Sequence, residues 1–182
     1  FYLCSNTAWG YFATCLTSTA STFTGNAGLF GKVYFPRLVV PVTNVIYGLL
    51  SFFIHIVLLL VLMVVFRSKG LVVAPNMMLM FVPLMILQIA LLGLGLGIII
   101  SSVTTKYRDL SILVGFGMQL WMYATPVVYP VSQVVALGEK AANLVMLNPV
   151  APIVNNFRYA FLGCGTMDFT YWGISWCVTL VV

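Results

Sequence analysis

The sequence predicts an all-α integral membrane protein, a helical bundle that crosses a bilayer several times. Two observations support this prediction. The chain of 182 residues has eight Lys or Arg and three Asp or Glu, which leave charge-free runs at 1–31, 38–66, 70–105 and 110–138. The mean hydropathy is +1.11 and charged residues make up 6%, whereas soluble domains carry about 25%. A helix needs about 20 apolar residues to cross a hydrocarbon core of roughly 30 Å, so each run is long enough.

The runs predict four spans and the beginning of a fifth, all within one transmembrane domain covering residues 1–182. We expect the spans near residues 3–24, 40–66, 76–102, 110–129 and, incompletely, 170–182. The chain begins at Phe1 without a Met and stops inside an apolar stretch. From this we expect the domain to be truncated at both ends.

The connections between spans alternate between the two sides of the membrane. Segments 25–37 and 103–109 share one side, and segments 67–75 and 130–168 share the other. Each side carries four Lys or Arg residues. An excess of basic residues normally marks cytoplasmic loops, so charge alone leaves the orientation open.

The connection 130–168 is unusually long and mostly apolar, which favours short re-entrant helices near 133–147 and 149–162. Asn148 is placed to cap the second of these, with Pro149 at its first position, and Gly163 stands where a helix commonly ends. Hydrocarbon would not tolerate the polar side of this helix, so we expect that side to face protein. It is formed by Asn155, Asn156 and Arg158.

The first span carries a polar seam at alternating four- and three-residue intervals, the spacing of one helical face. The seam consists of Thr7, Tyr11, Thr14, Ser18 and Ser21. Small hydroxyl side chains of this kind pack helices together, or they line a polar conduit. Both interpretations stay open.

Aromatic residues gather at the ends of the first and fourth spans, on the same side of the membrane. They are Trp9, Tyr11, Phe12, Trp121, Tyr123 and Tyr129. Tyr and Trp form belts at membrane interfaces. They also offer a flat apolar face with a polar edge, on which a sugar ring can stack. The residues are therefore either an interfacial belt or a substrate contact.

Several motifs are excluded by their spacing. Residues 25–32 resemble a phosphate-binding loop, but five residues separate Gly25 from Gly31 and Val33 replaces the required Ser or Thr. The glycine run 93–97 lies inside a span without a preceding strand, so it indicates close helix packing rather than dinucleotide binding.

The chain offers little for catalysis, metal binding or nucleic-acid binding. His55 has no acidic residue in its span, so we expect a hydrogen bond to a neighbouring helix. Paired carboxylates and the H-E-x-x-H and G-x-S-x-G motifs are absent from the sequence. The cysteines form no C-x-x-C pair and mostly lie in apolar stretches. The basic residues are spread over the loops, unlike the basic stripe of a nucleic-acid-binding protein.

Several segments together resemble a known family. In order and spacing they resemble the permease subunit of polysaccharide-exporting ABC transporters of the type-two exporter class, which moves lipid-linked O-antigen, capsule or teichoic acid. The segments are Asn26 to Arg37, Lys106 to Asp109, Gln119 to Trp121, Thr125 to Pro130, Leu147 to Pro149, and Phe157 to Tyr159. The chain departs from the family at Gly31, where a basic residue is common.

The resemblance implies that 27–36 form a cytoplasmic coupling helix pressed against a separate nucleotide-binding ATPase subunit. Its contact residues would be Leu29, Phe30, Lys32, Val33, Tyr34, Phe35, Pro36 and Arg37. A second cytoplasmic contact would be formed by Lys106, Arg108 and Asp109. Asp109 also suits the positive end of the following helix dipole.

The resemblance further implies a homodimeric permease in the bacterial cytoplasmic (inner) membrane, in contact with membrane lipids. The chain would bind no cofactor or metal, because ATP and magnesium would bind to the partner subunit. A lipid-linked glycan would pass along Thr7, Trp9, Tyr11, Thr14, Ser18, Ser21, Trp121, Tyr123 and Tyr129. The alternatives are a type-two ABC exporter of drugs or small lipids, and an integral-membrane enzyme that modifies glycans or lipids.

Overall fold

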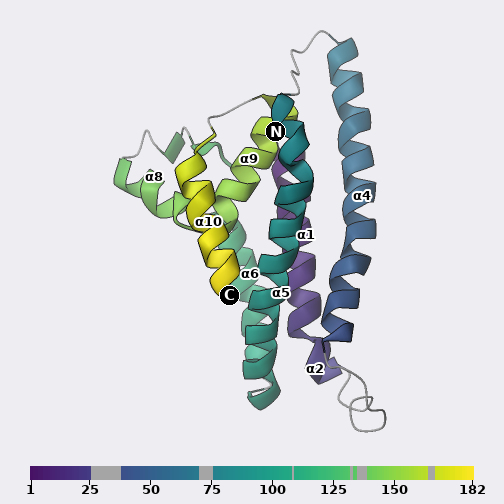
Figure 1. The fold of residues 1–182 in the computed structure, drawn as a ribbon, viewed down its shortest axis with the longest axis vertical. Helices are drawn as coiled ribbons and strands as arrows, with labels where there is room; N and C mark the ends of the chain where they lie inside the picture. Colours follow the sequence, from purple (N-terminus) through teal and green to yellow (C-terminus); the bar gives the residue numbers. More distant parts are fainter. Residues whose placement is uncertain (26–37, 70–75, 108, 132, 135–138, 164–166) are drawn as a thin grey trace.

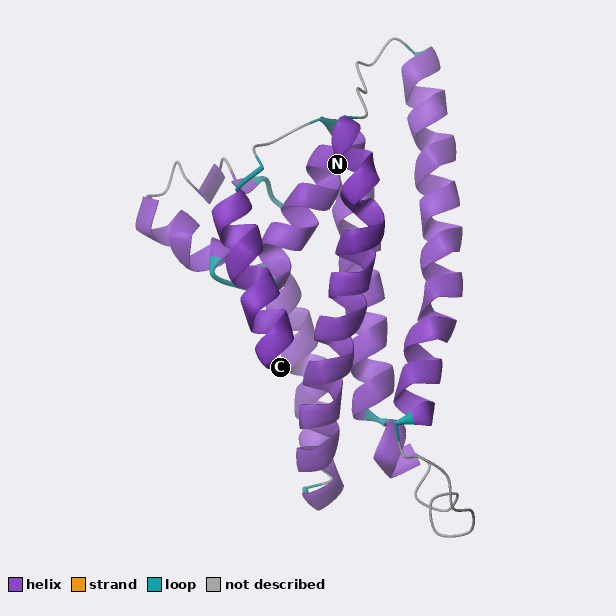
Figure 2. Ribbon diagram, in the orientation of Figure 1, coloured by secondary structure: helices purple, strands orange, loops and turns teal. Residues whose placement is uncertain are grey.

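The computed structural model describes residues 1–25, 38–69, 76–107, 109–131, 133–134, 139–163 and 167–182, and every regular element within them is a helix (Figure 2). The prediction of an all-α protein is confirmed. The longer helices are α1 (Tyr2–Ala20), α4 (Val39–Ser68), α5 (Val82–Lys106), α6 (Leu110–Ala124), α9 (Val150–Leu162) and α10 (Phe169–Val181). The shorter elements are α2 (Thr22–Gly25), the 3₁₀ helix η1 (Met77–Phe81) and α8 (Glu139–Met146).

The long helices run up and down through the molecule (Figure 1). Helix α2 and the junction between α5 and α6 lie at one end of the bundle, which we call the inner end. The C-terminal end of α4 lies at the opposite, outer end, and α8 and α9 lie toward it. The connections therefore alternate between the two ends, as the sequence predicts.

Helix α1 is the centre of the bundle, because it packs against α5, α4, α9 and α6. Its most extensive contact is with α5, where two glycines let the backbones approach. A Cβ atom added at Gly93 would lie 2.7 Å from Cys15 Cβ, and one at Gly97 would lie 2.5 Å from Thr19 Cβ. The prediction that this glycine run serves helix packing is confirmed.

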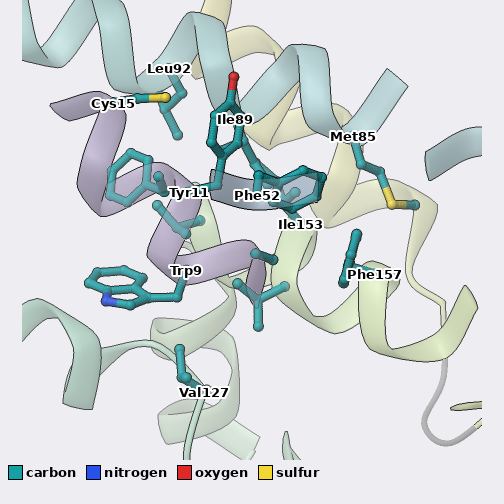
Figure 3. Close-up of a cluster of buried hydrophobic side chains, with 14 of the residues drawn as sticks. Trp9, Tyr11, Cys15, Phe52, Met85, Ile89, Leu92, Val127, Ile153 and Phe157 are labelled. Carbon is teal, nitrogen blue, oxygen red and sulfur yellow. The ribbon is translucent and has the colours of Figure 1, made fainter. Parts of the chain in front are cut away.

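The hydrophobic core lies where α1, α4, α5 and α9 meet (Figure 3). Buried side chains reach it from all four helices. They include Phe12 and Cys15 from α1, Phe52 from α4, Met85, Ile89 and Leu92 from α5, and Ile153 and Phe157 from α9. Because α9 contributes to this core, it is part of the bundle rather than a surface loop.

The stretches Val39–Ser68 and Met77–Lys106 are each long and apolar enough to cross a membrane. Helix α4 also exposes large apolar side chains along its length, among them Ile46, Phe53 and Val64. Such a surface suits hydrocarbon and would be unusual in water. Together with the composition, these helices make the chain a membrane protein.

Some element boundaries differ from the prediction. The expected span 110–129 contains a helix that ends at Ala124, because Pro126 lacks a backbone N–H and holds Thr125 in an extended conformation (φ −97°, ψ 140°). The first span divides into α1 and α2 at Ser21. The third opens with the 3₁₀ turn η1 before α5.

The two helices expected between residues 130 and 168 are present with adjusted limits. Helix α8 covers Glu139–Met146, within the range expected for the first of them, and α9 covers Val150–Leu162. Gly163 ends α9 with φ 66°, in the left-handed region that favours glycine, as predicted. The expected coupling helix 27–36 lies outside the described residues.

Candidate functional site

Helix α1 turns its polar seam and its tryptophan toward different neighbours. The ring centroids of Tyr11 and Phe52 lie 5.0 Å apart. The Tyr11 hydroxyl donates to the Val45 carbonyl of α4 at 3.4 Å. Trp9 instead faces α6, and its ring centroid lies 6.3 Å from that of Trp121. The outer part of the seam, around Tyr11, and the aromatic cluster therefore lie on different faces of α1.

The hydroxyls in the outer part of the seam bond largely within α1. The hydroxyls of Thr7 and Thr14 donate to carbonyls of their own helix at 2.8 Å, which satisfies them without a ligand. Near the inner end, the amide of Asn44 on α4 donates to the Ser18 carbonyl at 3.3 Å and to Thr22 Oγ1 at 3.1 Å. These bonds join the seam to α4.

A cavity of about 100 Å³ remains between α1 and α4, lined by Thr7, Tyr11, Thr14 and His55 among others. His55 is exposed, and its Nδ1 lies 2.7 Å from the carbonyl oxygen of Ser51, one turn earlier in the same helix. The predicted hydrogen bond to a neighbouring helix is therefore wrong. The ring nitrogen finds its partner within α4 itself.

The structure brings three of the predicted aromatic residues together, Trp9, Phe12 and Trp121. The rings of Trp9 and Phe12 lie 5.4 Å apart, and the ring of Phe12 meets that of Trp121 edge to face at 5.4 Å. This cluster joins α1 to α6. Tyr123 lies outside it and is 66% exposed, while the Tyr129 hydroxyl donates to the Tyr123 carbonyl at 3.1 Å.

Two neighbouring cavities follow α6 and share Val114, and we call the two together the groove. The inner cavity lies between α6 and the α1–α5 pair, and the outer cavity lies between α6 and α5. The inner cavity measures about 390 Å³ and is rich in hydroxyl groups. Its lining is Thr17, Ser18, Ala20, Ser21, Thr104, Ser111, Val114 and Gly115. The outer cavity measures about 520 Å³ and is apolar, with a lining of Ile100, Val114, Gly117, Met118, Leu120, Trp121 and Ala124.

The groove thus contains part of each predicted set, Ser18 and Ser21 from the seam and Trp121 from the aromatic residues. Five of the eight residues that line its inner half carry hydroxyl groups, and those of Thr17 and Ser21 already donate to carbonyls of α1. Its outer half offers apolar surface beside one tryptophan. An amphiphilic molecule matches this pattern, with its polar part toward the inner end. We regard the groove as the candidate site.

Asn148 connects α6 to the turn before α9, a role that sequence reasoning missed beyond the expected cap. Its Oδ1 accepts from Trp121 Nε1 at 3.1 Å and from the Val150 backbone N–H at 3.2 Å. Its Nδ2 donates to Thr125 Oγ1 at 2.8 Å. The N-cap of α9 is Pro149 rather than the expected Asn148, but the Asn148 amide bonds the first residue of α9 and holds the Trp121 indole at the edge of the groove.

A second buried network, also missed from the sequence, joins α5, α10 and the same turn. Trp172 Nε1 donates to Gln88 Oε1 at 2.9 Å, and Gln88 Nε2 donates to Ser175 Oγ at 2.8 Å. Ser175 Oγ then donates to the Pro149 carbonyl at 2.6 Å. An isolated glutamine within an apolar span was the one available signal of this network.

The polar side of α9 faces protein, as predicted. Arg158 is 2% exposed, donates to Asn155 Oδ1 and to the Pro126 carbonyl, and lies with its guanidinium carbon 4.3 Å above the Phe1 ring. Asn155 and Asn156 are also buried. These contacts hold the segment after α6 against α9.

At the inner end, Lys106 ends α5 and Asp109 precedes α6 at its N-cap position. Both are exposed, and Asp109 makes no capping hydrogen bond through its side chain. Its position at the helix start agrees with the prediction. Arg108 and the residues from Leu29 to Arg37 lie outside the described part of the chain. Within that part, no group of three potential metal ligands occurs.

Residues 2–162 match the ABC-2 type transporter family. The chain therefore belongs to this family, in agreement with its helical membrane fold. Among curated proteins it is similar to the "O-antigen export system permease protein RfbA" of Klebsiella pneumoniae, with 27% identity over 175 residues. It is also similar to the protein of the same name in Myxococcus xanthus, with 29% identity over 154 residues.

These alignments cover most of this chain but a smaller share of the relatives. The first covers 96% of this chain and 64% of the Klebsiella protein, and the second covers 84% and 56%. The chain thus spans less than two thirds of the length of these curated relatives. The resemblance proposed from the sequence is confirmed at the level of the family.

Proposed function

We propose that this chain is the membrane-spanning permease subunit of an ABC transporter that exports a lipid-linked polysaccharide across the bacterial cytoplasmic (inner) membrane. ATP hydrolysis takes place in a separate subunit, which binds the nucleotide and magnesium. The relatives named for O-antigen export support this substrate class. The observation that carries the proposal is the groove beside α6.

The groove supports the proposal because a lipid-linked glycan is itself amphiphilic. Sugar hydroxyls can donate to the Ser and Thr oxygens of the inner cavity, and the Trp121 ring offers an apolar face for a sugar ring or a lipid chain. The groove opens along a helix whose outward side chains are apolar, so a lipid can enter from the membrane.

A second copy of the chain completes the path in this proposal. Within α6, Ile112 is 77% exposed, and Leu113 and Phe116 are each 60% exposed. An apolar face beside a polar groove suits a symmetric partner, because α6 of the second copy would close the groove. Lys106, Arg108 and Asp109, with the segment from Leu29 to Arg37, provide the ATPase contact.

One observation favours a different cargo. The outer cavity is almost wholly apolar, which suits a drug or a small lipid better than a glycan. In that alternative, Trp121 contacts an apolar molecule and sugar stacking plays no part.

The test places the full-length gene, with its ATPase gene, in a bacterium that lacks its own O-antigen permease. We expect polysaccharide at the cell surface, detected by antibody. Trp121→Ala should lower export up to about tenfold, since an aromatic contact contributes about 0.5–1.5 kcal/mol. Tyr47→Ala is the matched control, because Tyr47 is exposed on α4 away from the groove. Efflux of small apolar compounds without surface glycan would instead favour the alternative.

A further inference from the structure

Helix α6 is attached to the bundle unevenly along its length. Met118 is the one buried residue among the described residues Leu110–Ala124. Toward the inner end, the groove separates α6 from α1 and α5, and Ile112 and Leu113 are largely exposed. Within a single copy of the chain, the inner half of α6 therefore has few packing contacts.

The outer end of α6 is held by directional bonds. Asn148 accepts from Trp121 Nε1 and donates to Thr125 Oγ1, so one amide binds the last turn of α6 and the residue after it. Arg158 of α9 adds a bond to the Pro126 carbonyl at 3.4 Å. The rings of Trp9 and Phe12 pack against the ring of Trp121.

The turn that carries Asn148 is itself fixed. Pro149, the next residue, accepts from Ser175 of α10, which is bonded to Gln88 of α5. Gln88 and Ser175 are both buried. Helix α5 is in turn packed closely on α1 through its glycines. The outer end of α6 is thus tied, through Pro149, Ser175 and Gln88, to the closely packed α1–α5 pair.

We propose that α6 acts as a lever whose pivot is Asn148 and whose inner end, held by few contacts within its own chain, swings away from α1 and α5. Asn148 is a positioning residue, because it acts through Trp121 and Thr125. The swing widens the hydroxyl-rich inner cavity while the outer cavity changes little. The force that moves the inner end would come from an ATPase subunit near Asp109, and this part of the inference rests on the proposed function. The position of the pivot rests only on the contacts described above.

The geometry gives the expected displacements. A helix of 15 residues is roughly 22 Å long. A rotation of about 15°, the size of one well-characterised rigid-body switch, moves a point about 20 Å from the pivot by about 5 Å. Ile112 lies at about that distance along the helix and should move by about 5 Å. Leu120 lies about 7 Å from the pivot and should move by about 2 Å.

The experiment measures both displacements in the full-length chain assembled with its ATPase. Native cysteines are replaced, and spin labels are placed on the pair Ser102 and Ile112 at the inner end and on the pair Leu120 and Leu144 at the outer end. All four positions are exposed. With a non-hydrolysable ATP analogue we expect the inner distance to change by about 5 Å and the outer by about 2 Å. Equal changes at both pairs, or none at either, would overturn the proposal.

Variants then test the pivot itself. In Asn148→Ala the distribution of the outer distance should broaden, and its mean should change as much as the inner distance does. In Asn143→Ala the outer distance should still change less than the inner one. Asn143 is a matched control, because it accepts one bond from Tyr171 on the exposed surface of α8. If Asn148→Ala fails to assemble, Trp121→Phe removes a single bond of the pivot and keeps a ring. If a folded Asn148→Ala or Trp121→Phe variant still shows a large inner and a small outer distance change, the proposed role of Asn148 is refuted.

Glycan export is measured separately in the same variants. Complexes that show both distance changes but export no glycan would refute the proposed cargo and leave the lever intact.

Discussion

Replacing Gly97 by Ala should separate α1 from α5. The added Cβ atom would lie 2.5 Å from Thr19 Cβ, 2.8 Å from Thr19 Cγ2 and 3.1 Å from the Leu16 carbonyl oxygen. Carbon atoms in good contact lie about 3.5–4.0 Å apart, so the helices must shift by about 1 Å. Rotation of Thr19 gives no relief, because its Cβ is itself too close.

The change in the free energy of unfolding of Gly97→Ala is the sum of two opposing effects. Overpacking of this kind costs about 1–3 kcal/mol. Ala is favoured over Gly in a helix by up to about 1 kcal/mol, which offsets part of that cost. We expect Gly97→Ala to lower the free energy of unfolding by about 1–2 kcal/mol. Gly93→Ala should act in the same direction, and the double variant should cost less than the sum, since one helix shift relieves both clashes.

The assay is reversible unfolding of the purified protein in mixed detergent micelles. Gly117→Ala is the matched control: Gly117 lies in α6 and a Cβ atom there would meet nothing within 4 Å. The control should be neutral or slightly stabilised. If Gly97→Ala and Gly117→Ala have equal unfolding free energies, the close α1–α5 contact is not a determinant of stability and the reasoning fails.

Three further predictions concern single side chains. Gln88→Leu leaves Trp172 Nε1 without its acceptor and should lower unfolding free energy by about 1–2 kcal/mol, while the exposed Gln119→Leu should change little in the same assay. Tyr11→Phe removes a 3.4 Å bond to Val45 and should cost less than about 0.5 kcal/mol; a cost above about 2 kcal/mol would contradict this. His55→Ala should leave transport unchanged, because its Nδ1 contact is with its own helix; loss of activity in a folded variant would favour the enzyme alternative.

The helices could be predicted because their causes are local. Charge-free runs long enough to cross a bilayer locate the spans, and Gly163 ends α9 where the sequence indicated. The main boundary error has a local cause as well. Pro126 follows an apolar run that continues past it, so hydropathy extended the span to 129, whereas the missing backbone N–H ends the helix at Ala124.

The division of the candidate site could not be predicted because it depends on which helix faces which side of α1. Tyr11 and Trp9 are two residues apart, so they project from α1 in nearly opposite directions. Their proximity in sequence suggested one aromatic surface. In the structure, Tyr11 contacts α4 and Trp9 contacts α6. Periodicity defines faces of a helix, but it carries no information about the neighbour that covers each face.

Amide side chains inside apolar segments allow a contact between helices to be predicted from sequence, although not the partner in that contact. Gln88 and Asn148 bond to partners 87 and 27 residues away, which a local pattern cannot identify. A buried amide in a membrane protein must nevertheless find partners, because hydrocarbon offers none. The position of Gln88 inside an apolar span is therefore enough to predict a contact between helices. Its partners are Trp172 and Ser175, about one turn apart on α10, so that helix docks on α5 in one register. The position of the Asn148 pivot follows from that docking, since Ser175 also holds Pro149.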